Sequence, residues 1–320
     1  MAAMEFTVSK SDLVRELNLS QGVVEKKTTI PILSNVLLET SGDQIVMTAT
    51  DLELGIRCTF PARVQKQGAG TIPARRLLDY VRLLPEADIN VKLGENQWAN
   101  LLCGRSRTRI AGMSRESYPE LPDMPEVLAE IPVGILSSMI AKTIFAISAE
   151  ESRFTLNGAL LILREDGLVM VSTDGHRLAL AETSIALPAG VGYRALLPRK
   201  AMSEILKLAQ ESAPEAPLRF SGDENHLFFQ LGDRLLISRK LTGNFPDFDR
   251  VLPKEHPSSI PLNRDELRSA IERVAQFSDE RSRAIKLQFR PGEIKLHSSV
   301  SETGESEESL SAEYSGAEME

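Results

Sequence analysis

Two short stretches, Leu33–Leu38 (LSNVLL) and Ile45–Asp51 (IVMTATD), decide the fold of this chain because each of them occurs twice. The first returns as Leu156–Leu161 (LNGALL) and the second as Leu168–Asp174 (LVMVSTD), in the same order and at the same spacing. A third version of the second stretch occurs at Ile294–Ser299 (IKLHSS). An interval of about 125 residues is a common domain length, so the repetition predicts duplicated domains.

Each complete copy has the periodicity of two helices with strands between them. Apolar residues recur at helical spacing over residues 9–19 and again after Pro73, and segments of alternating polarity separate them. We expect Pro73 to be the first helical residue, because proline is tolerated there. In the third copy the expected apolar stripe is Leu267, Ile271, Val274 and Phe277. The pattern predicts an α+β fold in which two helices pack on antiparallel sheets in every copy.

Proline-bearing stretches at Met124–Glu130 and Pro253–Ser259 mark the expected domain borders. They divide the chain into residues 1–127, 128–255 and 256–320. The third part is about half as long as the others, so we expect it to be an incomplete copy.

The charge of the chain is unevenly distributed. The net charge is −8, but residues 301–320 hold seven acidic residues and no basic one, which leaves the rest nearly neutral. Basic residues recur on the expected solvent faces of helices in all three copies: Lys10, Arg15, Arg75, Arg76, Arg82, Lys142, Arg199, Lys200, Lys207, Arg264, Arg268 and Arg273. If these helices face a common axis, they form one surface that binds phosphates without reading bases.

Several classes of protein are disfavoured by the sequence. It has no phosphate-binding GxxxxGK[ST] loop, HExxH, CxxC or GxSxG motif, and we expect no cofactor and no metal. No apolar run approaches the ~18 residues of a membrane span, and no signal pattern opens the chain, so we expect a cytoplasmic protein. Cys58 and Cys103 are expected to be reduced core thiols.

One constellation, Asp174-Gly175-His176-Arg177, resembles a site. It fits a turn followed by an exposed His-Arg pair, or an enzyme such as a hydrolase that uses Asp174 and His176. The first copy has Asp51–Leu54 (DLEL) at this position, so the His-Arg pair is specific to the second copy. For the chain as a whole, a module that recognises a particular DNA sequence is a further alternative function.

A series of motifs resembles one family along the whole chain. The motifs are TIPILSNVLLE (Thr29–Glu39), TATDLEL (Thr48–Leu54), TIPARRLLD (Thr71–Asp79), GRSR (Gly104–Arg107), LNGALL (Leu156–Leu161), STDGHRLAL (Ser172–Leu180), LPRKAM (Leu197–Met202), FPDFDRVLP (Phe245–Pro253) and EYSGAEME (Glu313–Glu320). Together they resemble the bacterial sliding clamp, the beta subunit of DNA polymerase III. The resemblance implies three clamp domains per subunit and a pseudo-symmetric ring of two subunits joined head to tail. It further implies a non-catalytic processivity factor that encircles double-stranded DNA without reading its sequence, polymerase activity being a property of the holoenzyme. The implied protein partners are the polymerase catalytic subunit, the clamp loader and other proteins with a clamp-binding motif.

The resemblance also implies three sets of site residues. The partner-peptide groove matches Leu156, Thr173, Gly175, His176, Arg177, Leu178, Pro246, Arg250 and Val251. The DNA-facing positions match Lys27, Arg75, Arg153, Phe154, Arg199 and Lys200. The subunit interface matches Arg76, Arg105 and Arg107 on one side and Phe277, Glu302, Glu305, Glu307 and Glu308 on the other.

The sequence departs from the family at its end. Family members continue for about 50 residues past Ser315–Glu320 (SGAEME), within a domain of about 125 residues. We therefore expect a chain that is truncated relative to the family and lacks one wall of the groove.

Overall fold

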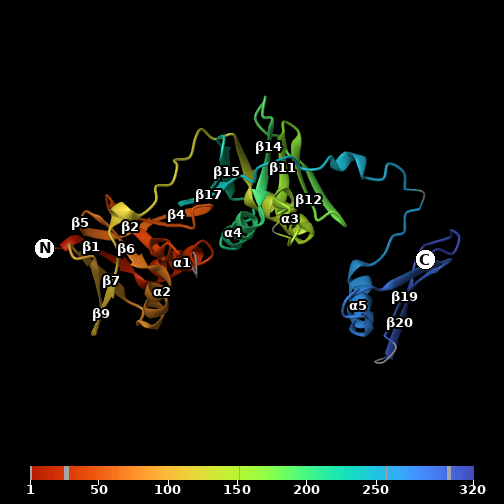
Figure 1. Cartoon of the computed structure of the whole chain (residues 1–320), viewed down its shortest axis with the longest axis horizontal. Helices are drawn as coiled ribbons and strands as arrows, with labels where there is room; N and C mark the ends of the chain where they lie inside the picture. Colours follow the sequence, from red (N-terminus) through yellow and green to blue (C-terminus); the bar gives the residue numbers. More distant parts are fainter. Residues whose placement is uncertain (1, 25–28, 151, 257, 301–303) are drawn as a thin grey trace. The chain divides into compact units, whose positions relative to one another are not determined.

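The computed structural model describes residues 2–24, 29–150, 152–256, 258–300 and 304–320. The chain forms two compact units, Met1–Pro246 and Asp247–Glu320, which are described separately (Figure 1). All strand pairs within the sheets are antiparallel, so the predicted α+β class with antiparallel sheets is confirmed.

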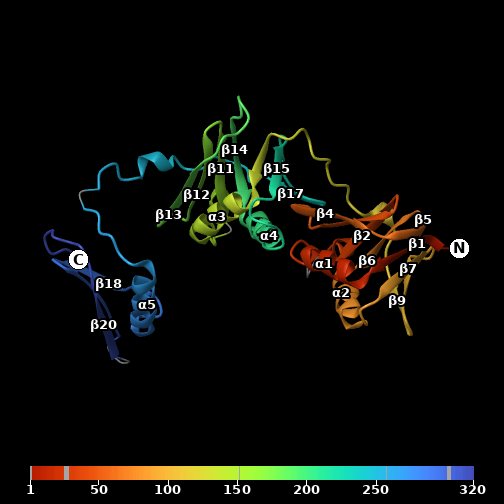
Figure 2. The ribbon, with the colours of Figure 1, turned by 180° about the vertical axis from the view of Figure 1, so that it is seen from behind.

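The first copy supplies nine strands and two α-helices of the first unit. Strands β1, β5, β7, β8 and β9 form a five-stranded sheet in the order β5-β1-β7-β8-β9. Helices α1 and α2 pack against each other beside these strands (Figures 1 and 2). The elements are β1 (Ala2–Ser9), α1 (Lys10–Ser20), β2 (Asn35–Ser41), β3 (Gln44–Thr50), β4 (Leu54–Pro61), β5 (Arg63–Lys66), β6 (Ala69–Pro73), α2 (Ala74–Leu83), β7 (Asp88–Gly94), β8 (Trp98–Cys103) and β9 (Ser106–Ala111), with short 3-10 turns η1 (Pro31–Ser34) and η2 (Arg115–Ser117).

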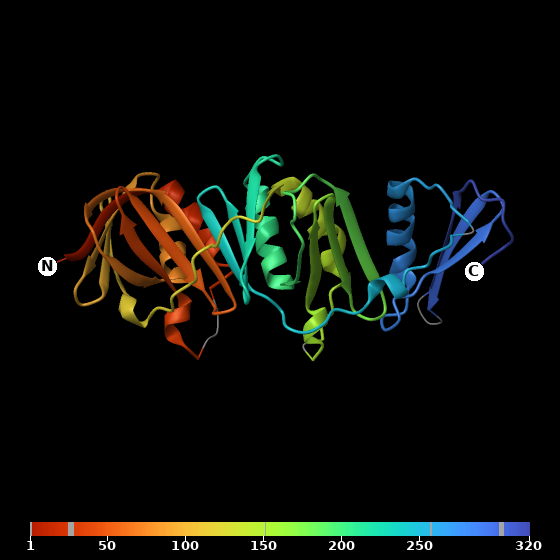
Figure 3. The ribbon, with the colours of Figure 1, turned by 90° about the horizontal axis from the view of Figure 1, so that it is seen from above.

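The second copy repeats this plan. Strands β11 to β14 form a four-stranded sheet in the order β13-β12-β11-β14, and α3 and α4 lie between it and a second sheet (Figure 3). The elements are β10 (Ala129–Pro132), α3 (Val133–Thr143), β11 (Gly158–Arg164), β12 (Gly167–Thr173), β13 (Leu178–Ser184), β14 (Tyr193–Pro198), α4 (Arg199–Gln210), β15 (Pro217–Gly222), β16 (His226–Leu231) and β17 (Arg234–Arg239), with 3-10 turns η3 (Ile144–Ala146) and η4 (Phe154–Leu156).

One sheet runs through both copies. Its order is β10-β15-β16-β17-β4-β3-β2-β6, and the pair β17–β4 joins the copies. Both predicted domains, 1–127 and 128–255, contribute to this sheet and to one apolar core, and the second unit begins at Asp247, ahead of the predicted border at 256. The three-domain division itself stays a prediction.

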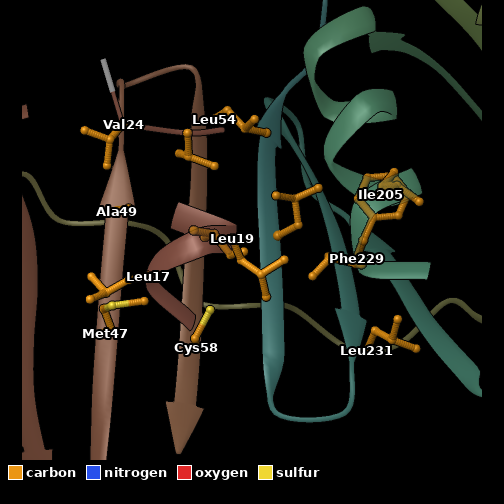
Figure 4. Packing of buried hydrophobic residues seen from close by; sticks show 14 of the residues in the cluster. Leu17, Leu19, Val24, Met47, Ala49, Leu54, Cys58, Ile205, Phe229 and Leu231 are labelled. Atoms are coloured by element: carbon orange, nitrogen blue, oxygen red, sulfur yellow. The ribbon is translucent and has the colours of Figure 1, made fainter. Parts of the chain in front are cut away.

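The β17–β4 joint, called the seam below, is closed on its helix side by apolar and ionic contacts. Figure 4 shows Leu19 and Cys58 of the first copy on one side of the joint and Ile205 and Phe229 of the second copy on the other, all in one apolar cluster. Beside them, an ionic group comprises Arg234 of β17, Glu16 of α1 and Glu211 after α4. Arg234 donates two hydrogen bonds to Glu16, at 2.9 and 2.8 Å, and lies 2.9 Å from Glu211. Burial alone would raise the pKa of Glu16, but the bonds from Arg234 and Arg15 hold it below its usual value.

The two cysteines are free and buried, as predicted. Burial raises the pKa of Cys58, which keeps it a thiol at the seam.

Prolines precede three of the helices, but not as predicted. Pro73, Pro132 and Pro198 each end a strand and occupy the N-cap, so the expectation that Pro73 is the first helical residue is wrong. The reason is that the last strand residue and the helix cap share an extended backbone, which the fixed φ of proline suits.

The second unit has one α-helix on a three-stranded sheet within its described residues. It contains η5 (Phe248–Arg250), α5 (Arg264–Val274), η6 (Ala275–Phe277), β18 (Lys286–Arg290), β19 (Glu293–Val300) and β20 (Gly304–Ser311). The predicted stripe on α5 needs a correction. Ala270 and Val274 are buried, whereas Ile271 is 36% exposed. Ala270 takes the central position because α5 lies close to β19 and β20, where a small side chain fits.

No helix in the described part of the chain is both long and apolar enough to cross a membrane.

Two tyrosines offer a matched test of the first unit. The Tyr118 hydroxyl is buried and donates to the Thr48 carbonyl at 3.0 Å, whereas the buried Tyr193 hydroxyl has no hydrogen-bond partner among the described residues. We expect Tyr118→Phe to lower the free energy of unfolding by about 1 kcal/mol, the usual value of such a bond. Tyr193→Phe is expected to be neutral or stabilising. Urea unfolding of both variants checks this, and equal losses would contradict it.

Candidate functional site

The Asp174 constellation forms a tight turn between β12 and β13. The Asp174 carboxylate accepts bonds from the backbone amides of His176 and Arg177, both at 3.0 Å, and from Nε of Arg177, also at 3.0 Å. Thr173 closes the turn by donating to the Arg177 carbonyl at 2.7 Å. Gly175 has φ +89°, a left-handed conformation that glycine adopts without strain. The turn therefore holds the exposed side chains of His176 and Arg177 at the edge of a buried sheet.

The first copy contains the same turn with different side chains. Asp51 accepts from the amides of Glu53 and Leu54 at 3.0 and 2.7 Å, and Thr50 donates to the Leu54 carbonyl at 2.9 Å. Leu52, with φ +78°, stands where the second copy has Gly175. The two copies therefore share the backbone conformation of the turn and differ in its exposed side chains.

This geometry does not support the enzyme hypothesis for Asp174 and His176. The amides of Arg177 and His176 lower the pKa of Asp174 to about 2, so the group stays ionised at neutral pH. A general acid or base works best with a pKa near the working pH. The turn interpretation is therefore the one that the contacts favour.

Aromatic and basic side chains gather beside this turn. Arg153 donates to the Asp174 carbonyl at 2.9 Å and pairs with Glu150 at 2.8 Å. Phe154 is 70% exposed, and the guanidinium of Arg177 lies 5.8 Å from the ring centre of Phe145, within cation–π range. Phe145 was missed from the sequence. Phe145 lies in η3, directly after α3, and is 53% exposed.

The predicted groove residues divide between the two units. Leu156 and Leu178 are half-buried in the first unit beside the turn, and Thr173 is buried. Pro246 is the last residue of that unit and is exposed. Arg250 and Val251 belong to the second unit, where Arg250 pairs with Asp247 at 2.7 Å and Val251 is exposed. The structure thus brings together the groove residues of the first unit that lie beside the turn. The contribution of Arg250 and Val251 to the groove stays a prediction.

The predicted DNA-facing residues are mostly exposed on the helices of the first unit. Arg75 lies on α2 at 3.7 Å from Asp79, and Arg199 opens α4. Lys200 pairs with Asp51 across the seam. Lys27 lies outside the described residues.

The predicted basic helix faces carry mixed charge. Arg15 pairs with Asp12, Lys207 with Glu204, and Arg268 with Glu272. Arg76, Lys142 and Arg199 are exposed, and the described part of the chain offers none of them an ion-pair partner.

The predicted interface residues lie in the β8–β9 hairpin and on α2 in the first unit, and on β20 and η6 in the second. Arg105 and Arg107 are exposed in the β8–β9 hairpin, and Arg76 is exposed on α2. In the second unit, the Glu307 carboxylate lies 2.7 Å from Lys295, and Glu308 accepts two bonds from Arg273 at 2.5 and 2.6 Å. These partners lower the pKa of both glutamates. Glu305 is exposed, Phe277 is half-buried, and Glu302 lies outside the described residues.

Arg109, which the sequence interpretation left out, lies on the same strand as Arg107. Its guanidinium stacks over Trp98 at 4.8 Å from the ring centre. Among the described residues, no group of three or more His, Cys, Asp or Glu side chains is placed to hold a metal ion.

Comparison with known families gives three consecutive matches. Residues 4–122, 130–247 and 249–320 match the N-terminal, central and C-terminal domains of the DNA polymerase III beta subunit.

Curated relatives and solved structures agree with these matches. The beta sliding clamp of Chlamydia muridarum is 36% identical over 318 residues, which cover 99% of this chain and 86% of the relative. That of Pseudomonas putida is 35% identical, with the same shares. The crystal structure of the DNA polymerase III subunit beta from Pseudomonas aeruginosa superposes with a TM-score of 0.92 at 33% identity, covering 99% of this chain and 86% of that one.

Proposed function

Because this chain belongs to the family of DNA polymerase III beta subunits, the bacterial sliding clamps, we propose that it acts as a DNA sliding clamp. The observation that carries the proposal is the run of three family domains, in order, from residue 4 to residue 320. The chain is a non-catalytic subunit and works in DNA replication as a homodimer. It encircles the DNA duplex and tethers the replicative polymerase to it. We expect the protein in the bacterial cytoplasm.

The division into domains 1–127, 128–255 and 256–320 is part of the proposal. The repeated order of helices and strands supports it, as do the ranges of the three family matches. Within a ring, each domain places its helices toward the DNA and its sheets outward.

The partner-peptide site lies at the Asp174 turn. Leu156 and Leu178 supply half-buried apolar surface, and Arg177 supplies a charged donor held by Asp174 and Phe145. A short peptide with apolar anchors and an acidic flank fits this combination. The polymerase, the clamp loader and other clamp-binding proteins would compete for it.

DNA contact is made by basic residues at helix starts. Arg199 and Lys200 open α4, and Arg75 stands near the start of α2. An exposed guanidinium or ammonium group binds any phosphate, so these contacts carry no sequence preference and weaken with salt.

The test is retention on DNA of different topology. A clamp loaded by a bacterial clamp loader onto a nicked circular plasmid should stay bound through gel filtration and be lost after linearisation, whatever the sequence. Arg199→Glu should reduce loading, because it places a negative charge against phosphate. Arg219→Glu, at an exposed side chain of strand β15, is the matched control and should load normally. Equal retention on linear DNA, or retention that follows one sequence, would contradict the proposal.

A further inference from the structure

A pocket of about 310 Å³ lies where the first and second copies meet, and it is called the junction pocket below. Glu53 and Leu54, at the end of the Asp51 turn, form its first-copy side. The second copy supplies the rest from η4, the start of α4, and the residues at the end of β17 and directly after it. The volume is at the small end of the range for ligand sites, about 300–1,000 Å³, so the pocket suits a short chain segment.

The junction pocket stands at the same turn of the repeat as the peptide site proposed for the second copy. The shared hydrogen bonds of the two turns place Glu53 where the second copy has His176, and Leu54 where it has Arg177. One backbone conformation thus forms a wall of the junction pocket in the first copy and part of the proposed peptide site in the second. The repeat therefore supplies two related places at which a peptide can contact the first unit.

The interior of the junction pocket is apolar. Leu54 and Ala201 line it as buried residues, Leu241 is half-buried, and the ring of Phe154 is exposed at its edge. An exposed ring beside buried aliphatic side chains accepts an apolar side chain, which is removed from water when it enters.

The rim of the junction pocket carries three cations, one of which is unpaired within the described residues. Lys200 pairs with Asp51, and Lys240 donates to the Asp223 carbonyl at 2.5 Å. Arg239 is exposed, and no described residue forms an ion pair or a hydrogen bond with its guanidinium. A guanidinium in this state can form two parallel bonds to a carboxylate.

The backbone that carries Arg239 is fixed in place. Its amide donates to the Glu53 carbonyl at 2.8 Å, and the Leu241 amide donates to the Leu196 carbonyl at 3.2 Å. These two bonds tie the rim to the first copy on one side and to β14 on the other. The junction pocket therefore needs little rearrangement to bind a ligand, which lowers the entropic cost of binding.

We propose that the junction pocket binds an acidic peptide segment of a partner protein, with one apolar side chain inserted between Leu54 and Phe154 and a carboxylate paired with Arg239. The proposal rests on the proposed function, which supplies partners that carry such segments, and adds a second peptide site to the one at the Asp174 turn. One chain could then hold two segments of a partner, or one segment from each of two partners.

Nucleic acid is the alternative occupant and fits the junction pocket less well. A strand carries a negative charge at every nucleotide and would need several unpaired cations, whereas Lys200 and Lys240 are already bound. The exposed Glu53 carboxylate at the rim would also repel a phosphate. A peptide can place its carboxylate at Arg239 and an uncharged residue beside Glu53.

Fluorescence anisotropy measures this site with a defined probe, a fluorescein-labelled peptide that has a single leucine between aspartates. The titration uses the Arg177→Ala chain, in which the peptide site at the Asp174 turn is weakened. In that background Arg239→Glu should weaken binding by about tenfold or more, which equals about 1.4 kcal/mol, because a carboxylate then faces the peptide carboxylate. Arg194→Glu, at an exposed cation of β14 outside the pocket, is the matched control and should bind as before.

Three results of this titration would overturn the proposal. Equal weakening by Arg194→Glu would show attraction by overall charge. Equal binding of a peptide with serine in place of the leucine would show that no apolar side chain enters. Stronger binding of a fluorescein-labelled oligothymidylate than of the peptide, lost in Arg239→Glu, would assign the pocket to nucleic acid.

A fluorescent reporter locates the bound peptide. Trp98 is the single tryptophan of the chain, so Trp98→Phe/Phe154→Trp places the only indole at the edge of the junction pocket. In the Arg177→Ala background its emission should shift to shorter wavelength as the peptide excludes water, with the same midpoint as the anisotropy titration. Unchanged emission at saturating peptide would place the peptide elsewhere and refute the junction site.

Peptide binding and retention on circular DNA fail independently of each other. A chain that stays on circular DNA but shows no peptide binding that depends on Arg239 keeps the clamp function and refutes the junction site. A wild-type chain that is lost from circular DNA contradicts the clamp function, while the titration still decides whether the junction pocket binds the peptide.

Discussion

Replacing Arg234 by alanine is expected to lower the free energy of unfolding of the first unit by about 3–5 kcal/mol, the usual cost of removing one partner of a buried ion pair. The side chains of Arg234 and Glu16 are 15% and 3% exposed, and the two bonds between them are the main ionic link across the seam. Without the guanidinium, the Glu16 carboxylate would stay buried beside Cys58 with only Arg15 to neutralise it.

Urea unfolding monitored by circular dichroism measures this loss. Arg219→Ala is the matched control, because the Arg219–Glu130 pair is about half exposed on both sides and should cost less than about 1 kcal/mol. A loss for Arg234→Ala no larger than that of the control would show that apolar packing alone holds the copies together. The double variant Arg234→Met/Glu16→Met should recover much of the stability, since buried ion pairs are often replaceable by apolar groups.

Replacing Phe229 by alanine should cost a similar amount, about 3–5 kcal/mol, through a cavity. Phe229 is fully buried at the second-copy side of the seam, where it packs near Ile205 of α4 and 5.3 Å from the ring of Phe220 (Figure 4). Phe154→Ala removes the same atoms from a ring that is 70% exposed, so it should change stability by less than about 0.5 kcal/mol.

Thermal and urea unfolding of the two phenylalanine variants separates packing from function. Phe154→Ala should retain its fold and lose DNA affinity, whereas Phe229→Ala should lose stability across both copies at once, because they share one sheet. Independent unfolding of the two copies in Phe229→Ala, seen as two transitions, would contradict the single cooperative unit.

Local features of the fold were determined by the sequence. The repeat at Leu33–Leu38 and Leu156–Leu161 predicted two equivalent copies, and the Asp174 turn followed from an aspartate that can accept from amides two and three residues ahead. Such features depend on residues that are close together in the sequence, so the sequence pattern can predict them. Most of the basic residues expected on helix surfaces are exposed, but Lys10 is half-buried and its ammonium group donates to the Leu84 carbonyl. The identity of the exposed groups on the Asp174 turn came from comparing one copy with the other.

Tertiary structure alone decided which distant residues meet. Nothing in the pattern around Glu16 indicates Arg234, which lies more than two hundred positions away, and nothing around Asp51 indicates Lys200. The position of Ala270 toward the sheet in place of Ile271 likewise depended on how closely α5 approaches β19 and β20. The copies are joined where strand β17 pairs with strand β4. The partner and the register of such a pair depend on both strands together, so the sequence of one strand does not determine them.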